Sequence, residues 1–182
     1  MKTDITQALV DEHRLILRMI ALLERNALRT KEGSYSNWQF YLDGIDFIRV
    51  YADRFHHAKE EDVLFVALVK NGMPRENSPV AAMLMEHEQG RAYVLGLETA
   101  VNEAMAGLPG RESDIAKNAL AYAALLRDHI AKEDDILYPL AERVLPEIVR
   151  LMLVEEYHRA EMRSSTDLSA FYRSLVEAYE KE

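Results

Sequence analysis

Long segments of this 182-residue chain carry apolar residues at the spacing of one face of an α-helix. Polar or breaker-rich stretches separate them, and no segment shows the strict alternation of a half-buried strand. The predicted segments run from Asp4 to about Arg29, from Trp38 to the NGMP stretch, from Ser78 to Met105, and from Ser113 to Pro139. This pattern predicts an all-α fold, an up-down antiparallel four-helix bundle.

Helix-start and helix-stop signals mark the ends of these segments. Asp4 can cap the first helix, and Ser78, which precedes a proline, can cap the third. Pro139 is expected to kink or end the fourth helix. We therefore predict one bundle over residues 1–145 and an additional C-terminal helical segment over residues 146–182, with a possible break at SSTD. This extension is expected to pack on the bundle or to form a homodimer surface.

Charge and cysteine content narrow the functions open to such a bundle. The net charge of -9 argues against a nucleic-acid partner and against an anionic membrane surface. The chain has no cysteine, so any metal ion must be held by nitrogen and oxygen ligands. The first dozen residues include acids, and no apolar run is long enough for a signal peptide or a membrane span. We therefore expect a cytoplasmic protein.

Histidines interrupt the apolar faces of the predicted helices from within. His13 stands four residues after Leu9 in the first helix, and His87 occupies the same kind of position in the third. In the fourth helix His129 precedes Glu133 by four residues, which places both side chains on one face. These side chains are expected to point into the bundle.

The second helix offers two overlapping His-x-x-x-Glu pairs within RFHHAKEEDVLF, namely His56 with Glu60 and His57 with Glu61. Only one pair can face the core of a regular α-helix squarely, because adjacent residues diverge by about 100°. His56 continues the apolar face, and alignment of KEEDVLF with KEDDILY places Glu60 opposite Glu133. We therefore predict His56 and Glu60 as the inward pair. His57 and Glu61 remain less certain ligands, and His57 is alternatively an outer partner of a ligand or a solvated residue.

The inward residues form an internal repeat. His13 and His56 are 43 residues apart, and His87 and His129 are 42 apart. A pair of metal ions fits this symmetry, because two carboxylates can bridge ions that take terminal imidazoles. Imidazole with carboxylate suits iron, manganese or zinc and disfavours calcium. The predicted metal ligands are His13, His56, Glu60, His87, His129 and Glu133.

Other polar and aromatic residues receive less specific interpretations. Arg91 stands one turn after His87, where its charge would disfavour a further ligand. Tyr122 is the best candidate for a phenol near the ions, although the tyrosines are otherwise interpreted as core residues, and His158 is expected at the surface. A solvated acidic face is predicted for Glu61, Asp62, Asp134 and Asp135.

Four motifs together resemble the hemerythrin-like HHE cation-binding family, namely DEHRLIL, FHHAKEEDVLF, MEHEQGR and DHIAKEDDILYP, over roughly residues 4 to 145. The resemblance implies a bundle around a non-heme di-iron centre, in which the four predicted inward histidines are terminal ligands and the two glutamates are bridging ligands. Oxygen-carrying members have a second imidazole where this chain has Arg91, which weakens the case for oxygen transport.

The family resemblance defines the site better than the role. Two iron ions are the expected cofactor, with zinc or manganese possible on isolation, and dioxygen or another small oxidant is the expected partner. Binding or sensing at an open coordination position is the leading hypothesis, and a sensor is favoured over an enzyme. The alternatives are a di-iron redox enzyme that consumes peroxide and an iron storage or repair protein.

Overall fold

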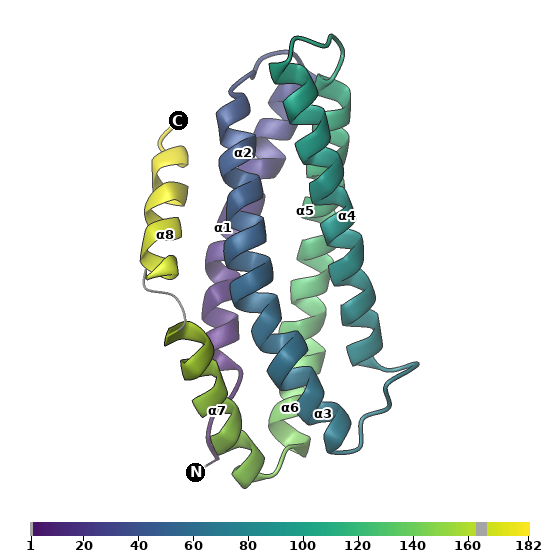
Figure 1. Ribbon diagram of the computed structural model, residues 1–182, viewed down its shortest axis with the longest axis vertical. Helices are drawn as coiled ribbons and strands as arrows, with labels where there is room; N and C mark the ends of the chain where they lie inside the picture. The colour runs from purple at the N-terminus through teal and green to yellow at the C-terminus, as the bar shows by residue number, and fades with distance from the viewer. Residues whose placement is uncertain (1, 163–166) are drawn as a thin grey trace.

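The computed structural model describes residues 2–162 and 167–182, and every regular element within these ranges is a helix (Figure 1). The helices are α1 (Gln7–Lys31), α2 (Trp38–Phe47), η1 (Ile48–His57), η2 (Glu60–Leu64), α3 (Phe65–Lys70), α4 (Pro79–Met105), α5 (Glu112–Lys132), η3 (Glu133–Leu137), α6 (Tyr138–Val144), α7 (Glu147–Met162) and α8 (Leu168–Tyr179). The elements labelled η are π-helices, whose hydrogen bonds reach one residue further than those of an α-helix. The all-helical prediction is confirmed. The break expected at SSTD falls largely on residues 163–166, which lie outside the described ranges.

Capping side chains start the helices where the sequence carries start signals. The carboxylate of Asp4 accepts a hydrogen bond from the backbone N–H of Gln7 at 2.8 Å. Ser78 Oγ accepts one from the N–H three residues on, at 3.2 Å, and Asn37 caps α2 in the same way. Each such cap satisfies a donor that the helix itself leaves free. The start predicted at Ser78 is therefore confirmed. Helix α1 instead begins at Gln7 with Thr6 at its N-cap position, two residues after the predicted cap Asp4, although Asp4 still binds the first free N–H groups.

The fourth helical segment continues past Pro139, because α6 extends to Val144. Proline cannot donate the backbone hydrogen bond that a regular helix requires at its position. The π-helix η3 ends at Leu137, two residues before this proline. At its end the N–H of Tyr138 bonds to the carbonyl of Glu133, five residues earlier. The chain thus accommodates the proline after a widened turn and does not end the helix there.

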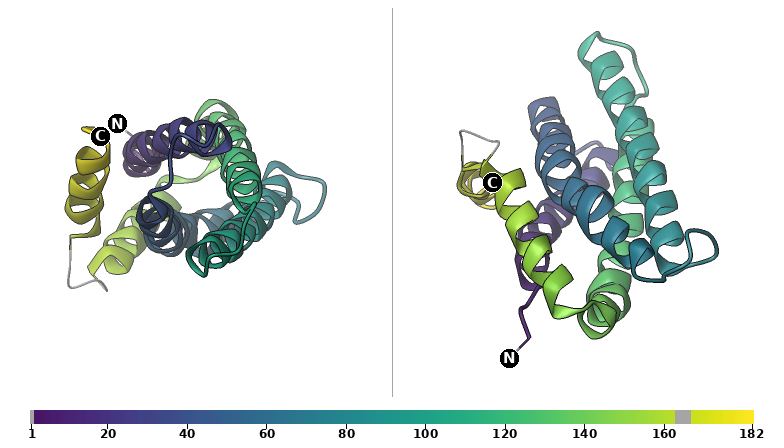
Figure 2. Two further views of the ribbon diagram at one scale, coloured as in Figure 1. Left: turned by 90° about the horizontal axis from the view of Figure 1, so that it is seen from above. Right: turned by 60° about the horizontal axis from the view of Figure 1, so that its bottom comes forward.

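The long helical segments pack side by side around one axis, as the view from above shows (Figure 2). Helix α1 contacts α5, α5 contacts α4, α4 contacts α2, and α2 contacts α1, which closes the ring. Because each segment turns its apolar face toward the axis, the ring encloses the apolar core. No helix in the described part of the chain is long and apolar enough to cross a membrane.

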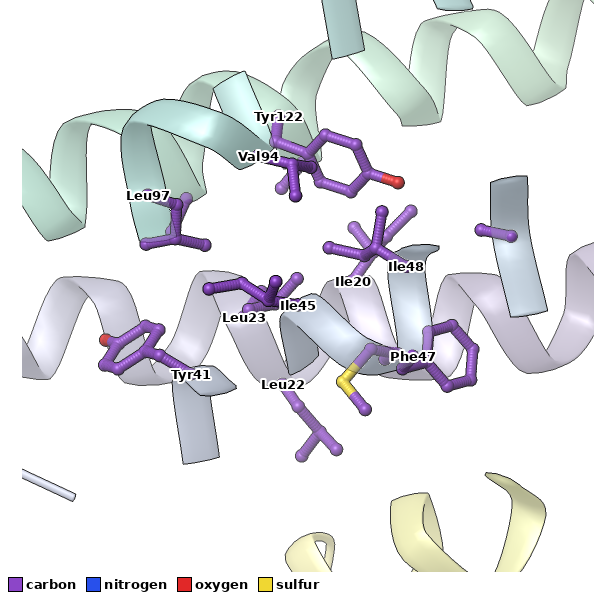
Figure 3. Close-up of a cluster of buried hydrophobic side chains, with 14 of the residues drawn as sticks. Ile20, Leu22, Leu23, Tyr41, Ile45, Phe47, Ile48, Val94, Leu97 and Tyr122 are labelled. Atoms are coloured by element: carbon purple, nitrogen blue, oxygen red, sulfur yellow. The ribbon is translucent and has the colours of Figure 1, made fainter. Parts of the chain in front are cut away.

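Two apolar clusters fill this axis at different heights. The larger one includes Ile20, Ile45 and Leu97 and is shown in part in Figure 3. The smaller one includes Leu9 and Leu64. The predicted metal ligands interrupt each segment between residues of the two clusters, so they share one polar layer.

The C-terminal helices lie against the outside of the ring (Figure 1). Helix α7 contacts η2, and α8 contacts α1 and η1. The buried guanidinium of Arg150 donates to the carbonyl oxygens of Thr3, at 2.7 Å, and Glu142, at 2.6 Å. The hydroxyl of Tyr172 donates to Asp46 at 2.7 Å. Specific polar contacts therefore fix both helices beside the segments that carry the histidines.

Candidate metal centre

Three widened turns position the central residues of the polar layer. The N–H of Ala58 bonds to the carbonyl of Asp53, and the N–H of Phe65 bonds to the carbonyl of Glu60, each five residues earlier. The turn that begins at Glu133 has the same geometry. A wider turn holds more residues, so adjacent side chains diverge by a smaller angle than in an α-helix. The chain can therefore direct neighbouring side chains toward the same centre.

The structure brings the buried histidines and glutamates into two adjacent groups. One group contains His13, His56 and Glu133, and the other contains His57, Glu60, His87 and His129. Within each group, one ligand atom of every residue lies within 4.8 Å of the others. All seven side chains are buried, with exposed fractions from 0% to 7%. All six predicted ligands and His57 thus meet in one place.

The imidazoles approach each other through their Nε2 atoms. His13 Nε2 lies 2.9 Å from His56 Nε2, and His87 Nε2 lies 3.0 Å from His129 Nε2. The ring of His57 stacks on that of His87, with ring centres 3.8 Å apart. Each pair of Nε2 atoms is close enough to share one cation or one proton.

Each glutamate belongs to one group and also approaches a histidine of the other. One oxygen of Glu133 lies 3.3 Å from Nε2 of His13, and the other lies 3.2 Å from Nε2 of His129. Oε2 of Glu60 lies 3.7 Å from His56 Nε2 and 3.6 Å from His87 Nε2. Either carboxylate can therefore contact a cation in each group at once, which is the geometry of a bridging ligand.

Carboxylates also hold the outer nitrogen of every imidazole in the centre. The Nδ1 atom of each histidine faces one carboxylate oxygen: Asp134 for His13 at 2.8 Å, Glu12 for His56 at 2.8 Å, Asp53 for His57 at 3.4 Å, Glu61 for His87 at 2.7 Å, and Glu86 for His129 at 3.0 Å. Such partners fix the proton on Nδ1 and leave the Nε2 lone pair for a metal ion. Two bare Nε2 atoms at about 3 Å would repel each other, and a cation between them removes this repulsion.

The two central carboxylates supply a further test of metal fit. Oε2 of Glu60 and both oxygens of Glu133 are buried without a hydrogen-bond partner in the part of the chain that the structure describes. A buried carboxylate that lacks a partner costs several kcal/mol. Two metal ions would satisfy all three oxygens, so the donor set fits a pair of cations that prefer nitrogen with carboxylate oxygen.

In the metal-free centre, bound protons offset part of the negative charge of the two buried glutamates. Burial lowers the pKa of His13, but the carboxylates of Asp134 and Glu133 beside its ring outweigh this effect and raise the pKa to about 9. Burial and the charge of Glu133 raise the pKa of Glu60 well above its usual range. Burial opposes ionisation of Glu133 too, but His129 and His13 lower its pKa well below the usual range. The metal-free centre thus holds protons at His13 and Glu60.

The prediction that His57 is rotated away from the core is wrong. His57 is 7% exposed and belongs to the second group, because η1 replaces the regular α-helix on which the prediction was based. Glu61 lies outside both groups, where it accepts a hydrogen bond from His87 Nδ1. Arg91 binds Glu61 and Asp53 at 2.7 Å and 2.6 Å. His57, and not the position of Arg91, therefore supplies the third imidazole of this group.

The phenol in contact with the centre belongs to Tyr138. Its hydroxyl donates to Glu60 Oε1 at 2.7 Å, and its ring stacks on His13. Tyr122, the predicted phenol, finds no hydrogen-bond partner among the described residues and lines a cavity beside His57, His87 and His129. His158 is exposed, as predicted.

The acidic residues after Glu133 differ in role, which contradicts part of the predicted solvated face. Asp134 holds His13, whereas Asp135 is exposed.

Because His13 would lose the acceptor that orients its ring, we expect Asp134→Ala to weaken metal binding roughly 10- to 100-fold. Chelator competition on the purified protein measures this loss. Asp135→Ala is the matched control, and equal affinities of the two variants would contradict the assigned role.

Comparison with known proteins agrees with this geometry. The family model for the hemerythrin HHE cation binding domain matches residues 4–141. Uncharacterized proteins of Mycobacterium bovis and Mycobacterium tuberculosis are 22% identical over 170 residues, which cover 93% of this chain. The match covers 65% of the length of these relatives. No solved structure gives a significant match. The family match spans most of the chain and contains every residue of both groups, so the chain belongs to the hemerythrin HHE cation-binding family.

Proposed function

We propose that this protein holds a non-heme di-iron centre that binds or senses dioxygen or a related small oxidant. The observation that carries the proposal is the position of the two glutamates, each of which contacts an imidazole in both groups. We also propose that α1, the α2–α3 segment, α4 and the α5–α6 segment are the four columns of an up-down bundle. Within it, Glu60 and Glu133 would bridge the ions.

The two halves of the centre supply different numbers of imidazoles. His13 and His56 serve one half, whereas His57, His87 and His129 serve the other. With both carboxylates shared, the two-histidine half would leave more coordination positions to a small molecule. Histidine-carboxylate sites with open positions are typical of iron proteins that react with oxygen. A bound iron pair would supply redox chemistry and exchangeable coordination positions.

The surrounding residues would control polarity at the two-histidine half. The hydroxyl of Tyr138 donates a hydrogen bond to Glu60, and its oxygen lies 3.5 Å from His13 Nε2. The apolar side chains of Leu9 and Leu64, both fully buried, belong to the cluster next to this layer. The hydroxyl of Tyr138 is thus engaged with Glu60, whose carboxylate it would orient beside the two-histidine half.

Metal content and the optical spectrum of the purified protein test this proposal together. We expect about two iron ions per chain, as the two groups of ligands require. We also expect a ligand-to-metal charge-transfer absorption that changes when reduced protein meets oxygen. A purified protein that does not bind iron would contradict the di-iron centre. If the spectrum of the iron-loaded protein does not change on addition of oxygen, nitric oxide or peroxide, the oxidant-binding role would be contradicted.

Two further measurements separate binding from the alternative roles. Catalytic consumption of hydrogen peroxide by the iron-loaded protein, absent from a Glu133→Ala variant, would support a redox enzyme. Rapid and reversible transfer of iron to a chelator would support iron storage or repair. A binding or sensing protein is expected to retain its iron and to show no sustained turnover.

A further inference from the structure

A cavity of about 170 Å³ lies beside the three-histidine half of the metal centre. His57, His87 and His129 form part of its wall. Much of the remaining wall is apolar and includes Ile48 and Val94. For comparison, a protein cavity of about 150 Å³ lined by apolar side chains can hold a benzene molecule. The cavity therefore has room for a small organic molecule as well as for diatomic ligands.

One polar group in this cavity has no protein partner. Tyr122 lines the cavity, is 3% exposed, and its hydroxyl makes no hydrogen bond to any described residue. In Figure 3 its ring extends away from Leu97, and its oxygen lies toward the side of Ile48. A buried hydroxyl without a partner costs roughly 1–3 kcal/mol. A molecule in the cavity with an acceptor oxygen would recover this cost.

The charges around the cavity disfavour an anionic ligand. Arg49 and Arg91 line it and are partly exposed, but neither guanidinium is free. Arg49 forms two contacts to Glu98, at 2.5 Å and 2.6 Å. Arg91 binds three carboxylates, those of Asp53, Glu61 and Glu88. Both guanidiniums are thus already paired with carboxylates, so neither is available to bind an anionic ligand.

We propose that this cavity binds a neutral organic molecule of about the size of benzene, whose oxygen accepts a hydrogen bond from Tyr122. The apolar wall would contact the body of the ligand, and the hydroxyl of Tyr122 would fix its orientation. The ligand would thus lie next to His57, His87 and His129. The proposal does not depend on which metal the centre holds.

Benzyl alcohol is the probe, and benzoate is its charged counterpart. We expect calorimetric titration to show saturable binding of benzyl alcohol, and much weaker binding of benzoate, to the full chain loaded with iron or with zinc. Agreement between the two metals would keep this result separate from the di-iron proposal. Absence of saturable binding, or equal affinity for benzoate, would overturn the inference.

Two variants test the assigned position. Tyr122→Phe removes only the hydroxyl and is expected to weaken binding of benzyl alcohol roughly five- to tenfold, without lowering the melting temperature. Gly90→Leu adds a side chain at the cavity wall, where a Cβ atom would already lie 3.5 Å from the Tyr122 ring. We expect it to weaken binding more than tenfold while circular dichroism and metal content stay unchanged. Wild-type affinity in both variants would place the ligand elsewhere and overturn the proposal.

Discussion

Glu133→Ala is expected to lose at least half of the bound metal. Glu133 is fully buried, its two oxygens lie 3.3 Å and 3.2 Å from the Nε2 atoms of His13 and His129, and neither has a hydrogen-bond partner. Its removal leaves Glu60 as the single carboxylate between the groups. The loss of affinity should exceed the roughly 10- to 100-fold effect expected for a residue behind a ligand. Elemental analysis after gel filtration measures the retained metal.

Neighbouring acids provide controls for this variant. Asp134→Ala should have an intermediate effect, because Asp134 contacts His13 only from the outside. Asp135→Ala should retain wild-type metal content, since its side chain is exposed. Circular dichroism should show that all three variants keep their helices. Full metal content in Glu133→Ala would contradict a bridging role, whereas equal loss in all three variants would indicate a general charge effect.

Helical periodicity was sufficient to predict the secondary structure and most of the buried polar layer. His13, His87 and His129 each interrupt an apolar face, and each is no more than 2% exposed. The same reasoning predicted buried positions for Glu60 and Glu133. These predictions succeeded because side chains three or four residues apart on a helix share a face. Whether the residues bind metal remains a prediction.

The departures from a regular α-helix explain what periodicity missed. In a regular helix His56 and His57 would point about 100° apart, so only one was predicted to face the core. The π-helix η1 buries both. Two further π-helices begin at Glu60 and Glu133. Pro139 offered a sequence signal for the last of these, but no comparable residue marks the others.

The carboxylates behind the imidazoles follow the internal repeat, and that repeat could have identified them. Glu12 and Glu86 each precede a histidine in sequence, yet each holds the histidine of the following segment. Asp134 and Glu61 each follow a central glutamate, Glu133 or Glu60, and hold the histidine of another helix. Each half of the repeat also carries a lysine that pairs with such a carboxylate, because Lys59 binds Glu12 and Lys132 binds Glu86. The two-fold pattern predicted from the ligands thus extends to the residues that orient them.

Removal of the metal ions is expected to lower the free energy of unfolding by several kcal/mol. A metal that binds only the folded state contributes about 4 kcal/mol when its free concentration is a thousand times its dissociation constant. Chelation would also leave the buried carboxylates of Glu60 and Glu133 dependent on protons alone. Urea denaturation with and without chelator measures the difference. Chelator should have a much smaller effect on Glu133→Ala, and an unchanged wild-type midpoint would contradict a structural contribution of the metal.

Metal-free and metal-loaded protein should also respond to pH in opposite directions. The pKa of His13 is about 9 in the metal-free fold against an ordinary 6.5. Its stabilising contribution is therefore fully present below pH 6.5 and is lost as the pH rises toward 9, by up to about 3 kcal/mol. Metal binding requires unprotonated imidazoles, so the loaded protein should instead gain stability over the same range until its ligands are deprotonated. Denaturation series at several pH values test both slopes. His13→Gln should flatten the slope of the metal-free protein, and a metal-free wild type that gains stability between pH 6.5 and 9 would contradict the protonated His13.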